Sequence, residues 1–280
     1  MQSKAGEPPP DQPSRADPAS PNPNVEFYEA IAPFYEEIYG EIDAEETVRQ
    51  WVLLLEGLGL VPDRQARQAA RPRLIDVGCG PGWHLAVWHA AGFEVSGLDA
   101  SPSMLRLTER NFLQATGRNC PLFVADIRRQ DSLPSVEPFD LAVSHFNFLN
   151  LFPPQEREAV FNGVARLVRL GGAWITDFAE PLRPPRNVRQ TVDLGPGASP
   201  LKRVGRFDPP RQCYEQRWTV GGVDRTEVYW FNCSNQLNNL AERTGWRPVR
   251  RCRWTPGRPV GRRWTQDAET DTLVDIYRRI

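Results

Sequence analysis

The stretch Leu74-Ile-Asp-Val-Gly-Cys-Gly-Pro-Gly-Trp83 decides the fold of this chain. It begins as a short apolar run, which predicts a buried β-strand, and three glycines spaced two apart follow directly. Glycine is needed where a backbone turns sharply and approaches a ligand closely, because it has no Cβ. We expect a helix to start straight after Gly82. A strand, a glycine turn and a helix in this order indicate the opening unit of a doubly wound α/β sheet.

Predicted helices precede this unit, and strands alternate with helices after it. Before it, two amphipathic helices are expected at residues 25–40 and 44–58, with a polar connection at 62–73. After it, the pattern predicts strands at 94–98, 122–125, 141–144 and 173–178, with helices at 103–115 and 155–168. Short apolar strands alternating with helices are typical of a parallel sheet covered by helices on both faces.

The alternation of predicted strands and helices ends after residue 180. Pro and Gly punctuate residues 181–200, and three β-like runs follow at 201–207, 211–220 and 223–231. Gly221-Gly222 predicts a two-residue hairpin turn between the last two runs. A helix at 235–244 and strands near 248–254 and 272–279 end the chain. The predicted fold is therefore a doubly wound, seven-stranded Rossmann-like α/β sheet with a β-rich insertion, residues 181–231, before the last helix.

The composition is that of a globular protein with a polar N-terminal segment. The 280 residues are 40% hydrophobic and 25% charged, which suffices for one large domain, expected at residues 25–280. Residues 1–24 are proline-rich and polar, which predicts a disordered tail and neither a signal peptide nor a membrane anchor. No apolar run approaches the roughly 20 residues of a membrane span. The five cysteines are scattered, which favours reduced thiols, a cytoplasmic setting and no metal site.

The net charge of −1 supplies no general affinity for nucleic acid, so no nucleic-acid partner is expected. The charge is unevenly placed, because residues 181–280 hold 19 Lys and Arg but only 10 Asp and Glu. A solvated Arg-rich face packed against an acidic half explains this, and an anionic ligand near the C-terminal region is the alternative.

Carboxylates stand at three expected strand ends. Asp76 can orient the glycine loop or face an ammonium group. Asp99 ends the second strand, where one carboxylate can accept hydrogen bonds from two ribose hydroxyls. Asp126 follows the third strand and could accept from an adenine amine, with Ile127 against the ring. The alternative role for Asp126 is a helix cap.

The spacing of the glycines restricts the ligand further. A dehydrogenase fingerprint reads GxGxxG, whereas this loop reads GxGxG and continues with the bulky Trp83. That pattern suits a nucleoside ligand without phosphates, which in this fold means S-adenosylmethionine (SAM). Ser101 is a predicted N-cap of the next helix, and Met104 lies either against adenine or in the core.

The segments LIDVGCGPG, VSGLDASPSML, VADI, FDLAVSHFNFLNLF and LVRLGGAWITDF, in this order, resemble the class I SAM-dependent methyltransferases. The likeness covers residues 28–178. It implies that SAM is the cofactor and that the two loops contribute Gly78, Cys79, Gly80 and Ala100 to its site.

The segment YEAIAPFYE, residues 28–36, is similar to an N-terminal element of the small-molecule branch of that superfamily. In that branch the tyrosines, here Tyr28 and Tyr35, close over the cofactor and can reach its methionine carboxylate. The segment FDLAVSHFNFLNL is similar to the branch's fourth-strand motif, although Asn147 stands where Asp is common. Strand-rich inserts comparable to residues 181–231 cover the acceptor pocket in such enzymes.

The candidate general base is His145, which follows the fourth strand, because imidazole accepts protons near neutral pH. The competing interpretation is that His145 packs against SAM or bonds a backbone carbonyl. His84, in the helix after the glycine loop, is expected to be structural.

The predicted function is methyl transfer from SAM to an oxygen or nitrogen nucleophile of a small-molecule acceptor. Two alternatives remain open. One is a protein or RNA methyltransferase that docks its substrate on the Arg-rich half, and the other is a non-catalytic SAM-binding partner protein. A dehydrogenase is disfavoured by the glycine spacing. Neither the acceptor nor the oligomeric state follows from the sequence.

Overall fold

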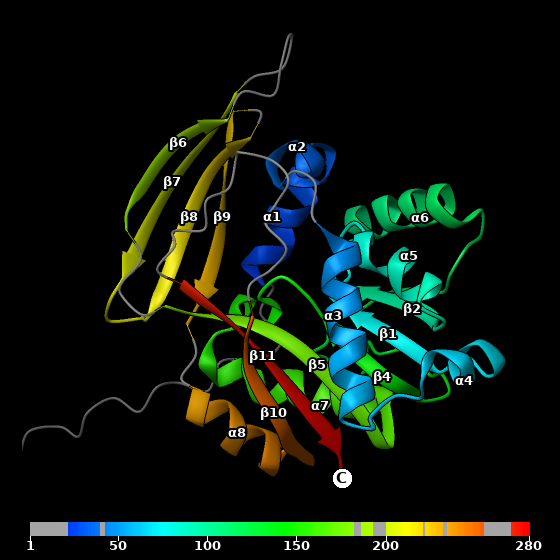
Figure 1. Ribbon diagram of the computed structural model, residues 1–280. Coiled ribbons are helices and arrows are strands. Elements are labelled where there is room, and N and C mark those ends of the chain that lie inside the picture. The colour runs from blue at the N-terminus through cyan, green and yellow to red at the C-terminus, as the bar shows by residue number, and fades with distance from the viewer. Residues whose placement is uncertain are drawn as a thin grey trace, which may run out of the picture.

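The computed structural model describes residues 22–39, 43–181, 186–192, 200–220, 222–231, 234–254 and 270–280. Within these ranges two sheets carry the architecture (Figure 1). The first has seven strands in the order β10-β11-β5-β4-β1-β2-β3, and the second has four in the order β6-β7-β8-β9. The predicted fold class, a seven-stranded Rossmann-like sheet with a β-rich insertion before the last helix, is confirmed.

The seven-stranded sheet is mostly parallel. Its strands are β1 (Arg73–Val77), β2 (Glu94–Asp99), β3 (Leu122–Val124), β4 (Phe139–Ser144), β5 (Val168–Pro181), β10 (Trp246–Trp254) and β11 (Thr270–Arg279). Strands β1 to β5 pair in parallel, and β11 runs antiparallel between β5 and β10. Because parallel strands end at the same edge, the carboxyl ends of β1 to β4 meet on one side of the sheet, where loops collect a ligand site.

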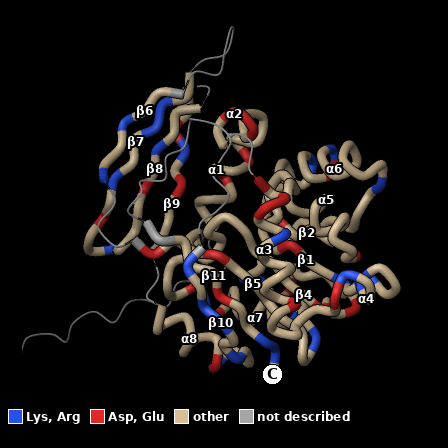
Figure 2. The backbone as a smooth tube through the Cα atoms, viewed as in Figure 1, with Lys and Arg blue, Asp and Glu red and all other residues tan. Residues whose placement is uncertain are grey.

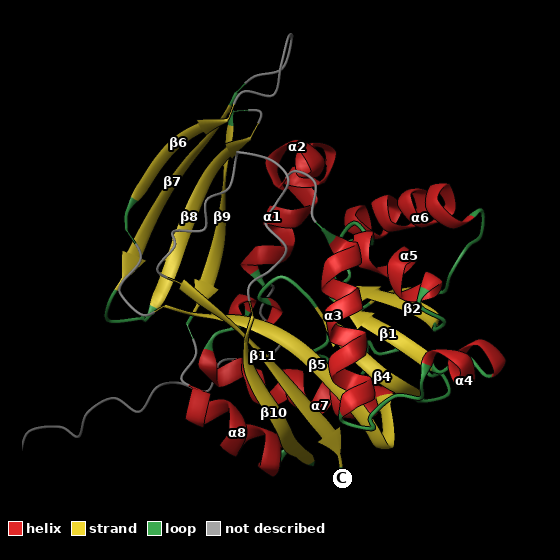
Figure 3. Cartoon of the chain, in the orientation of Figure 1, coloured by secondary structure: helices red, strands yellow, loops and turns green. Residues whose placement is uncertain are grey.

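Helices cover both faces of this sheet, as the sequence predicts (Figure 3). On one face, α3 (Ala44–Gly57), α5 (Trp83–Ala90) and α6 (Pro102–Thr116) contribute to one buried apolar cluster with β1 and β4. On the other face, α7 (Arg157–Leu167) and α8 (Ser234–Arg243) contribute to a second cluster. None of the helices in the described part of the chain is long and apolar enough to cross a membrane.

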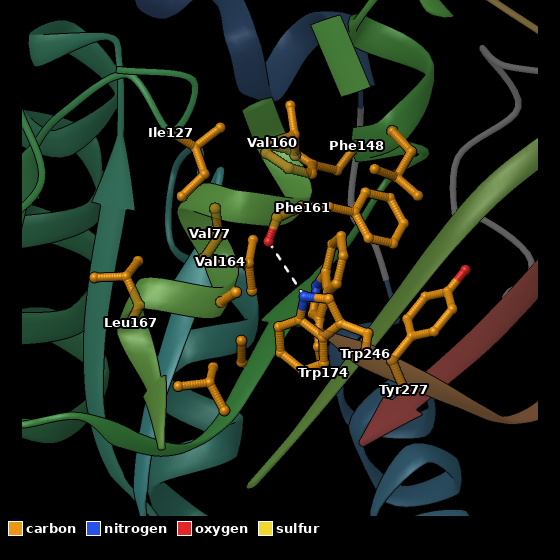
Figure 4. Close-up of a cluster of buried hydrophobic side chains, with 14 of the residues drawn as sticks. Val77, Ile127, Phe148, Val160, Phe161, Val164, Leu167, Trp174, Trp246 and Tyr277 are labelled. Carbon is orange, nitrogen blue, oxygen red and sulfur yellow. Dashed lines mark hydrogen bonds between the residues drawn. The ribbon is translucent and has the colours of Figure 1, made fainter. Parts of the chain in front are cut away.

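Aromatic rings dominate the second cluster (Figure 4). The Trp174 ring centroid lies 4.9 Å from that of Phe161 and 5.8 Å from that of Trp246. The Trp246 indole N–H donates to the Phe161 carbonyl oxygen at 3.2 Å, so the polar atom of this buried ring is paired. Full burial of one such side chain contributes about 1.5–3 kcal/mol. These contacts hold α7 and β10 against Trp174 of strand β5, in the middle of the sheet.

The smaller sheet is an antiparallel meander of β6 (Val188–Val192), β7 (Leu201–Asp208), β8 (Cys213–Val220) and β9 (Val223–Trp230). We call it the cap sheet. Its inner face packs on α1 (Pro23–Ile31) and α2 (Tyr35–Tyr39), where Phe27, Ile31 and Trp218 form a third buried cluster with Met104 of α6. The N-terminal helices therefore lie between the cap sheet and the main sheet (Figure 1).

Figure 2 shows that the strands of the cap sheet contain many basic residues. Side chains alternate along a strand, so Arg217 points away from the face to which its neighbour Trp218 contributes. Arg217, Arg189, Lys202 and Arg206 are all exposed. This arrangement agrees with the interpretation of a solvated Arg-rich face.

Several elements differ from the sequence predictions. The single helix expected at 25–40 is divided into α1, the 3-10 turn Ala32–Phe34 and α2. The division falls at Pro33, which has no amide hydrogen to donate to a helix. The polar connection contains a missed helix, α4 (Arg64–Ala69), which the Asp63 carboxylate caps by accepting from the Ala66 N–H at 2.9 Å.

The insertion contains a fourth strand, β6, which falls in the stretch expected to be irregular. The predicted two-residue hairpin agrees with the pairing of Val220 and Val223, although Gly221 itself lies outside the described residues. The predicted tail boundary at residue 24 is too late. Helix α1 begins at Pro23, and the Asn22 side chain caps it by accepting from the Asn24 N–H at 2.9 Å. The first 21 residues of the predicted tail lie outside the described residues.

Candidate active site

The glycine loop combines a tight turn with close packing. Gly78, Gly80 and Gly82 all have positive φ angles, of 77°, 52° and 76°. A Cβ at Gly78 would lie 2.5 Å from the Phe148 ring, and one at Gly82 would lie 2.5 Å from the Thr108 side chain. At Gly80 no atom lies within 4 Å of a Cβ position. Protein side chains therefore occupy the space at two of these glycines, whereas the space beside Gly80 is open.

A pocket lies where the ends of β1 to β4 meet, with a volume of about 930 Å³ including the part open to solvent. Every residue of the predicted site lines it: Tyr28, Tyr35, Asp76, Gly78, Cys79, Gly80, Asp99, Ala100, Met104, Asp126, Ile127 and His145. The individual roles of these residues stay predictions.

Asp99 joins the two loops of the site. Its Oδ2 accepts the Gly80 N–H and its Oδ1 accepts the Ser101 N–H, both at 2.9 Å. A carboxylate has about four acceptor positions, so capacity for ribose hydroxyls remains after these two bonds. Burial raises the Asp99 pKa to about 6. Ser101 is the predicted N-cap of α6, and its Oγ accepts from the Met104 N–H at 3.1 Å.

Asp76 is a buried carboxylate without a full set of partners. Its side chain is 1% exposed, and Oδ1 has no hydrogen-bond partner among the described residues. Burial, and then the charges of Asp99 and Asp177, raise its pKa well above the usual value. A buried charge without a partner is costly. The α-ammonium group of SAM would supply the missing positive charge, so the residues of this pocket fit that ligand.

Asp126 lines the pocket with its carboxylate already engaged. It forms an ion pair with Arg128, whose Nε lies 3.0 Å from Oδ1 and whose backbone N–H donates to the same oxygen at 3.0 Å. Arg128 also pairs with Glu156 at 2.7 Å. A predicted contact with adenine would have to share this carboxylate with Arg128. The local backbone bond resembles the capping role considered as the alternative.

The two predicted tyrosines differ in what their hydroxyl groups do. The Tyr28 hydroxyl donates to Oε1 of Glu227, a cap-sheet residue, at 2.9 Å. The Tyr35 hydroxyl makes no hydrogen bond to the part of the chain that the structure describes, and its ring lies 5.3 Å from that of Trp83. Tyr35 is therefore the tyrosine with a hydroxyl available to a ligand, whereas Tyr28 presents its ring.

His145 is a neutral imidazole with an engaged ring nitrogen. Its Nε2 accepts the Trp88 indole N–H at 3.1 Å, which leaves the proton of the neutral ring on Nδ1. The ring stacks on Trp51 at 4.3 Å and on His84 at 3.9 Å. Burial, and secondarily the charge of His84, lowers its pKa well below the usual value. This geometry weighs against the predicted role as general base and favours the competing interpretation of packing.

The sequence predicts a structural role for His84, and the structure places this residue in the pocket wall. Its ring lies between His145 and the edge of Phe146, whose centroid is 5.3 Å away. Burial lowers its pKa to about 3, so the ring is neutral. Further residues that the sequence did not indicate are Glu227, which accepts from Tyr28, and Asp177, which binds the turn after β4. They come from distant segments, and no local motif marks them.

Comparisons with known proteins agree with this geometry. Residues 74–172 match a family model described as a methyltransferase domain. No curated protein matches the chain. The fold is similar to that of a SAM-dependent methyltransferase from Clostridium acetobutylicum, with 14% identity and a TM-score of 0.66 over 90% of this chain and 99% of that one.

Two other similar structures are sugar-modifying enzymes. One is a sugar N-methyltransferase from Streptoalloteichus sp., with 17% identity and a TM-score of 0.60 over 100% of this chain and 99% of that one. The other is a SAM-bound amino pentose methyltransferase from Micromonospora echinaspora, with 18% identity and a TM-score of 0.55 over 88% of this chain and 94% of that one. The methyltransferase-domain match over residues 74–172, the sheet order and the pocket at its carboxyl edge together support the predicted resemblance to the class I SAM-dependent methyltransferases.

Proposed function

We propose that the protein transfers the methyl group of SAM to a nitrogen or oxygen nucleophile of a small molecule, and that amino sugars are the first acceptors to test. The observation that carries the cofactor part is the convergence of all twelve predicted residues on one pocket. The similarity in fold to a sugar N-methyltransferase and to an amino pentose methyltransferase, over 100% and 88% of this chain, supports the choice of acceptor.

SAM supplies a methyl group already activated by its sulfonium, so the protein's task is to align donor and acceptor and to exclude water. In this proposal Asp76 holds the α-ammonium group and Asp99 the ribose hydroxyls. Tyr35 donates its hydroxyl to the methionine carboxylate. Burial raises the pKa of Tyr35 above its ordinary value, so the hydroxyl keeps its proton and remains a donor.

The acceptor would enter beside Phe146, whose ring is 43% exposed although it lines the pocket. The cap sheet and α1 would cover that side, which is the role we propose for residues 181–231. Burial keeps both nearby imidazoles neutral, His84 with a pKa of about 3. An amine that arrives unprotonated needs no base to attack a methyl group, whereas the proton of a hydroxyl must be removed. A pocket wall with these two neutral imidazoles therefore suits an amine acceptor better than a hydroxyl acceptor.

Calorimetry with purified protein tests the cofactor. We expect SAM to bind and NAD(H) to give no signal. Asp99→Asn should weaken SAM binding at least about tenfold, because an amide cannot accept from both loops and the ribose. Glu109→Gln, which removes an exposed carboxylate on α6, is the matched control and should bind like the wild type. Wild-type protein that does not bind SAM would overturn the proposal.

A panel of amino sugars, simple glycosides and short glycopeptides tests the acceptor, with mass spectrometry reporting the gain of one methyl group. Methylation of an amino sugar would support the proposal. Methylation of RNA or a protein, lost as salt is raised, would favour docking on the Arg-rich face. SAM binding without turnover on any acceptor class would favour a non-catalytic partner protein.

A further inference from the structure

The turn after β4 has an unusual backbone. Phe146 and Asn147 have φ angles of 62° and 57°, so two consecutive residues other than glycine occupy the left-handed region. This conformation is unfavourable for any residue with a Cβ, and more so for a bulky one such as phenylalanine. It persists only where surrounding contacts over-determine it, and it is common at functional sites.

One side chain from the neighbouring strand holds this turn. The Asp177 carboxylate, on β5, accepts the Asn147 N–H at 2.7 Å through Oδ1 and the Phe146 N–H at 3.3 Å through Oδ2. Asp177 is 7% exposed. These backbone bonds are charge-assisted when the carboxylate is ionised, which makes them stronger than neutral ones. They link the turn directly to the centre of the sheet.

The turn shapes a large part of the pocket wall. His145, Phe146 and Phe148 line the pocket from this one segment. His145 stacks against His84, and Phe148 fills the space left by the missing Cβ of Gly78. A relaxed turn would therefore disturb the contact with the glycine loop as well as the exposed ring of Phe146.

We propose that Asp177 is a positioning residue, whose carboxylate holds the Phe146–Asn147 turn in its left-handed form and so keeps the His145–Phe148 wall in place to receive the cofactor. Asp177 does not line the pocket and is not offered as a ligand contact. The proposal rests on the cofactor site of the proposed function and is independent of the identity of the acceptor.

Amide hydrogen exchange and binding of S-adenosylhomocysteine test the proposal without an acceptor. In the ligand-free wild type, we expect the amides of Phe146 and Asn147 to be protected. Asp177→Ala should remove that protection while the amides of Ala142 and Val143, inside β4, stay protected. The same variant should bind S-adenosylhomocysteine about tenfold more weakly, because a preorganised wall has been lost.

A glycine substitution separates positioning from general damage. Asn147→Gly in the Asp177→Ala background should recover about threefold in affinity, because glycine adopts the left-handed conformation freely. Gln212→Gly in the same background is the matched control. Gln212 also has a positive φ, of 51°, but its turn joins β7 and β8 in the cap sheet. This control should recover nothing.

Three results would overturn the proposal: unchanged affinity in Asp177→Ala, retained protection of both amides, or equal recovery with Gln212→Gly. If Asp177→Ala does not fold, Asp177→Asn replaces it, and its single neutral acceptor should protect the two amides less than the wild type. Equal protection would then count against the proposal. A wild type that fails to bind S-adenosylhomocysteine would instead refute the cofactor site, and the exchange measurement would still decide the role of Asp177.

Discussion

The main sheet and the cap sheet each bury a carboxylate near the pocket, and the two are used differently. Asp76, on β1, has an oxygen without a partner among the described residues. Glu227, on β9, is equally buried, at 1% exposed, but its oxygens accept from Tyr28, Tyr39, Tyr229 and Gln216. Asp76 therefore has an oxygen that is open to a ligand, whereas Glu227 joins separate segments of the same chain. Two equally buried carboxylates can therefore differ in function, because their hydrogen-bond partners differ.

Glu227 connects three elements through hydroxyl groups. The distances to Oε1 are 2.9 Å from Tyr28 of α1, 3.3 Å from Tyr39 of α2 and 2.7 Å from Tyr229 of β9. Burial raises the pKa of Glu227, and the bonds from Tyr229, Tyr28 and Tyr39 oppose that shift. Since Tyr28 also lines the pocket, the cap sheet is coupled to the cofactor site through this cluster.

The largest expected effect compares a buried tryptophan in each sheet. Trp174→Ala should lower the free energy of unfolding by about 3–5 kcal/mol, because it leaves a cavity in the main core. Trp218→Ala should instead release the cap sheet and α1 locally, since Trp218 packs on Phe27 at 5.9 Å. Denaturant unfolding and hydrogen exchange distinguish the two. A single cooperative loss in both variants would mean that the two sheets are not separate packing units.

The second comparison replaces each of the two carboxylates, Glu227 and Asp76, in turn. Glu227→Ala should lower the free energy of unfolding by about 3 kcal/mol, because it leaves buried tyrosine hydroxyls without their hydrogen-bond acceptor. Asp76→Asn should leave stability unchanged or higher, because burial already disfavours the charge of Asp76, yet it should weaken SAM binding about tenfold. Urea unfolding and calorimetry measure these effects. A large loss of stability in Asp76→Asn would contradict the distinction.

The third prediction concerns pH. Burial raises the Asp99 pKa from 3.8 to about 6, and the ionised form is the one that can accept from ribose hydroxyls. SAM affinity should therefore be highest above pH 7 and fall as the pH drops through about 6. Stability should move oppositely, since a raised carboxyl pKa makes the contribution of Asp99 fall as pH rises from about 4 to 6. Calorimetry from pH 5 to 8 checks the affinity, and Asp99→Asn should flatten the profile.

The smallest effect separates the two tyrosines. Tyr35→Phe should weaken SAM binding by about threefold with little change in stability, because the Tyr35 hydroxyl has no hydrogen-bond partner among the described residues. Tyr28→Phe should lower the free energy of unfolding by about 1–2 kcal/mol, since it removes a hydrogen bond to a buried carboxylate. Equal effects of both variants on SAM affinity would show that the Tyr28 hydroxyl also reaches the ligand.

The main sheet and the residues at its edge could be predicted from the sequence alone. Short apolar runs indicated its five parallel strands, and carboxylates at strand ends placed Asp76, Asp99 and Asp126 at one edge, because parallel strands end together. These signals are local, because the glycine spacing and the strand ends can each be recognised within a segment of about ten residues. They located the pocket, but they did not reveal which carboxylate has an oxygen without a partner among the described residues.

The hydrogen-bond partners became visible in the three-dimensional structure alone. The Arg128 pair with Glu156 and the Trp88 bond to His145 are made between side chains whose meeting no pattern predicts. Glu227 lies 199 residues from Tyr28, and Asp177 lies 30 residues from Asn147. Periodicity specifies which face of an element is buried, whereas hydrogen-bond partners depend on how separate elements pack. Packing therefore decides which polar groups of this pocket are already bonded and which, such as Asp76 Oδ1, have no partner among the described residues.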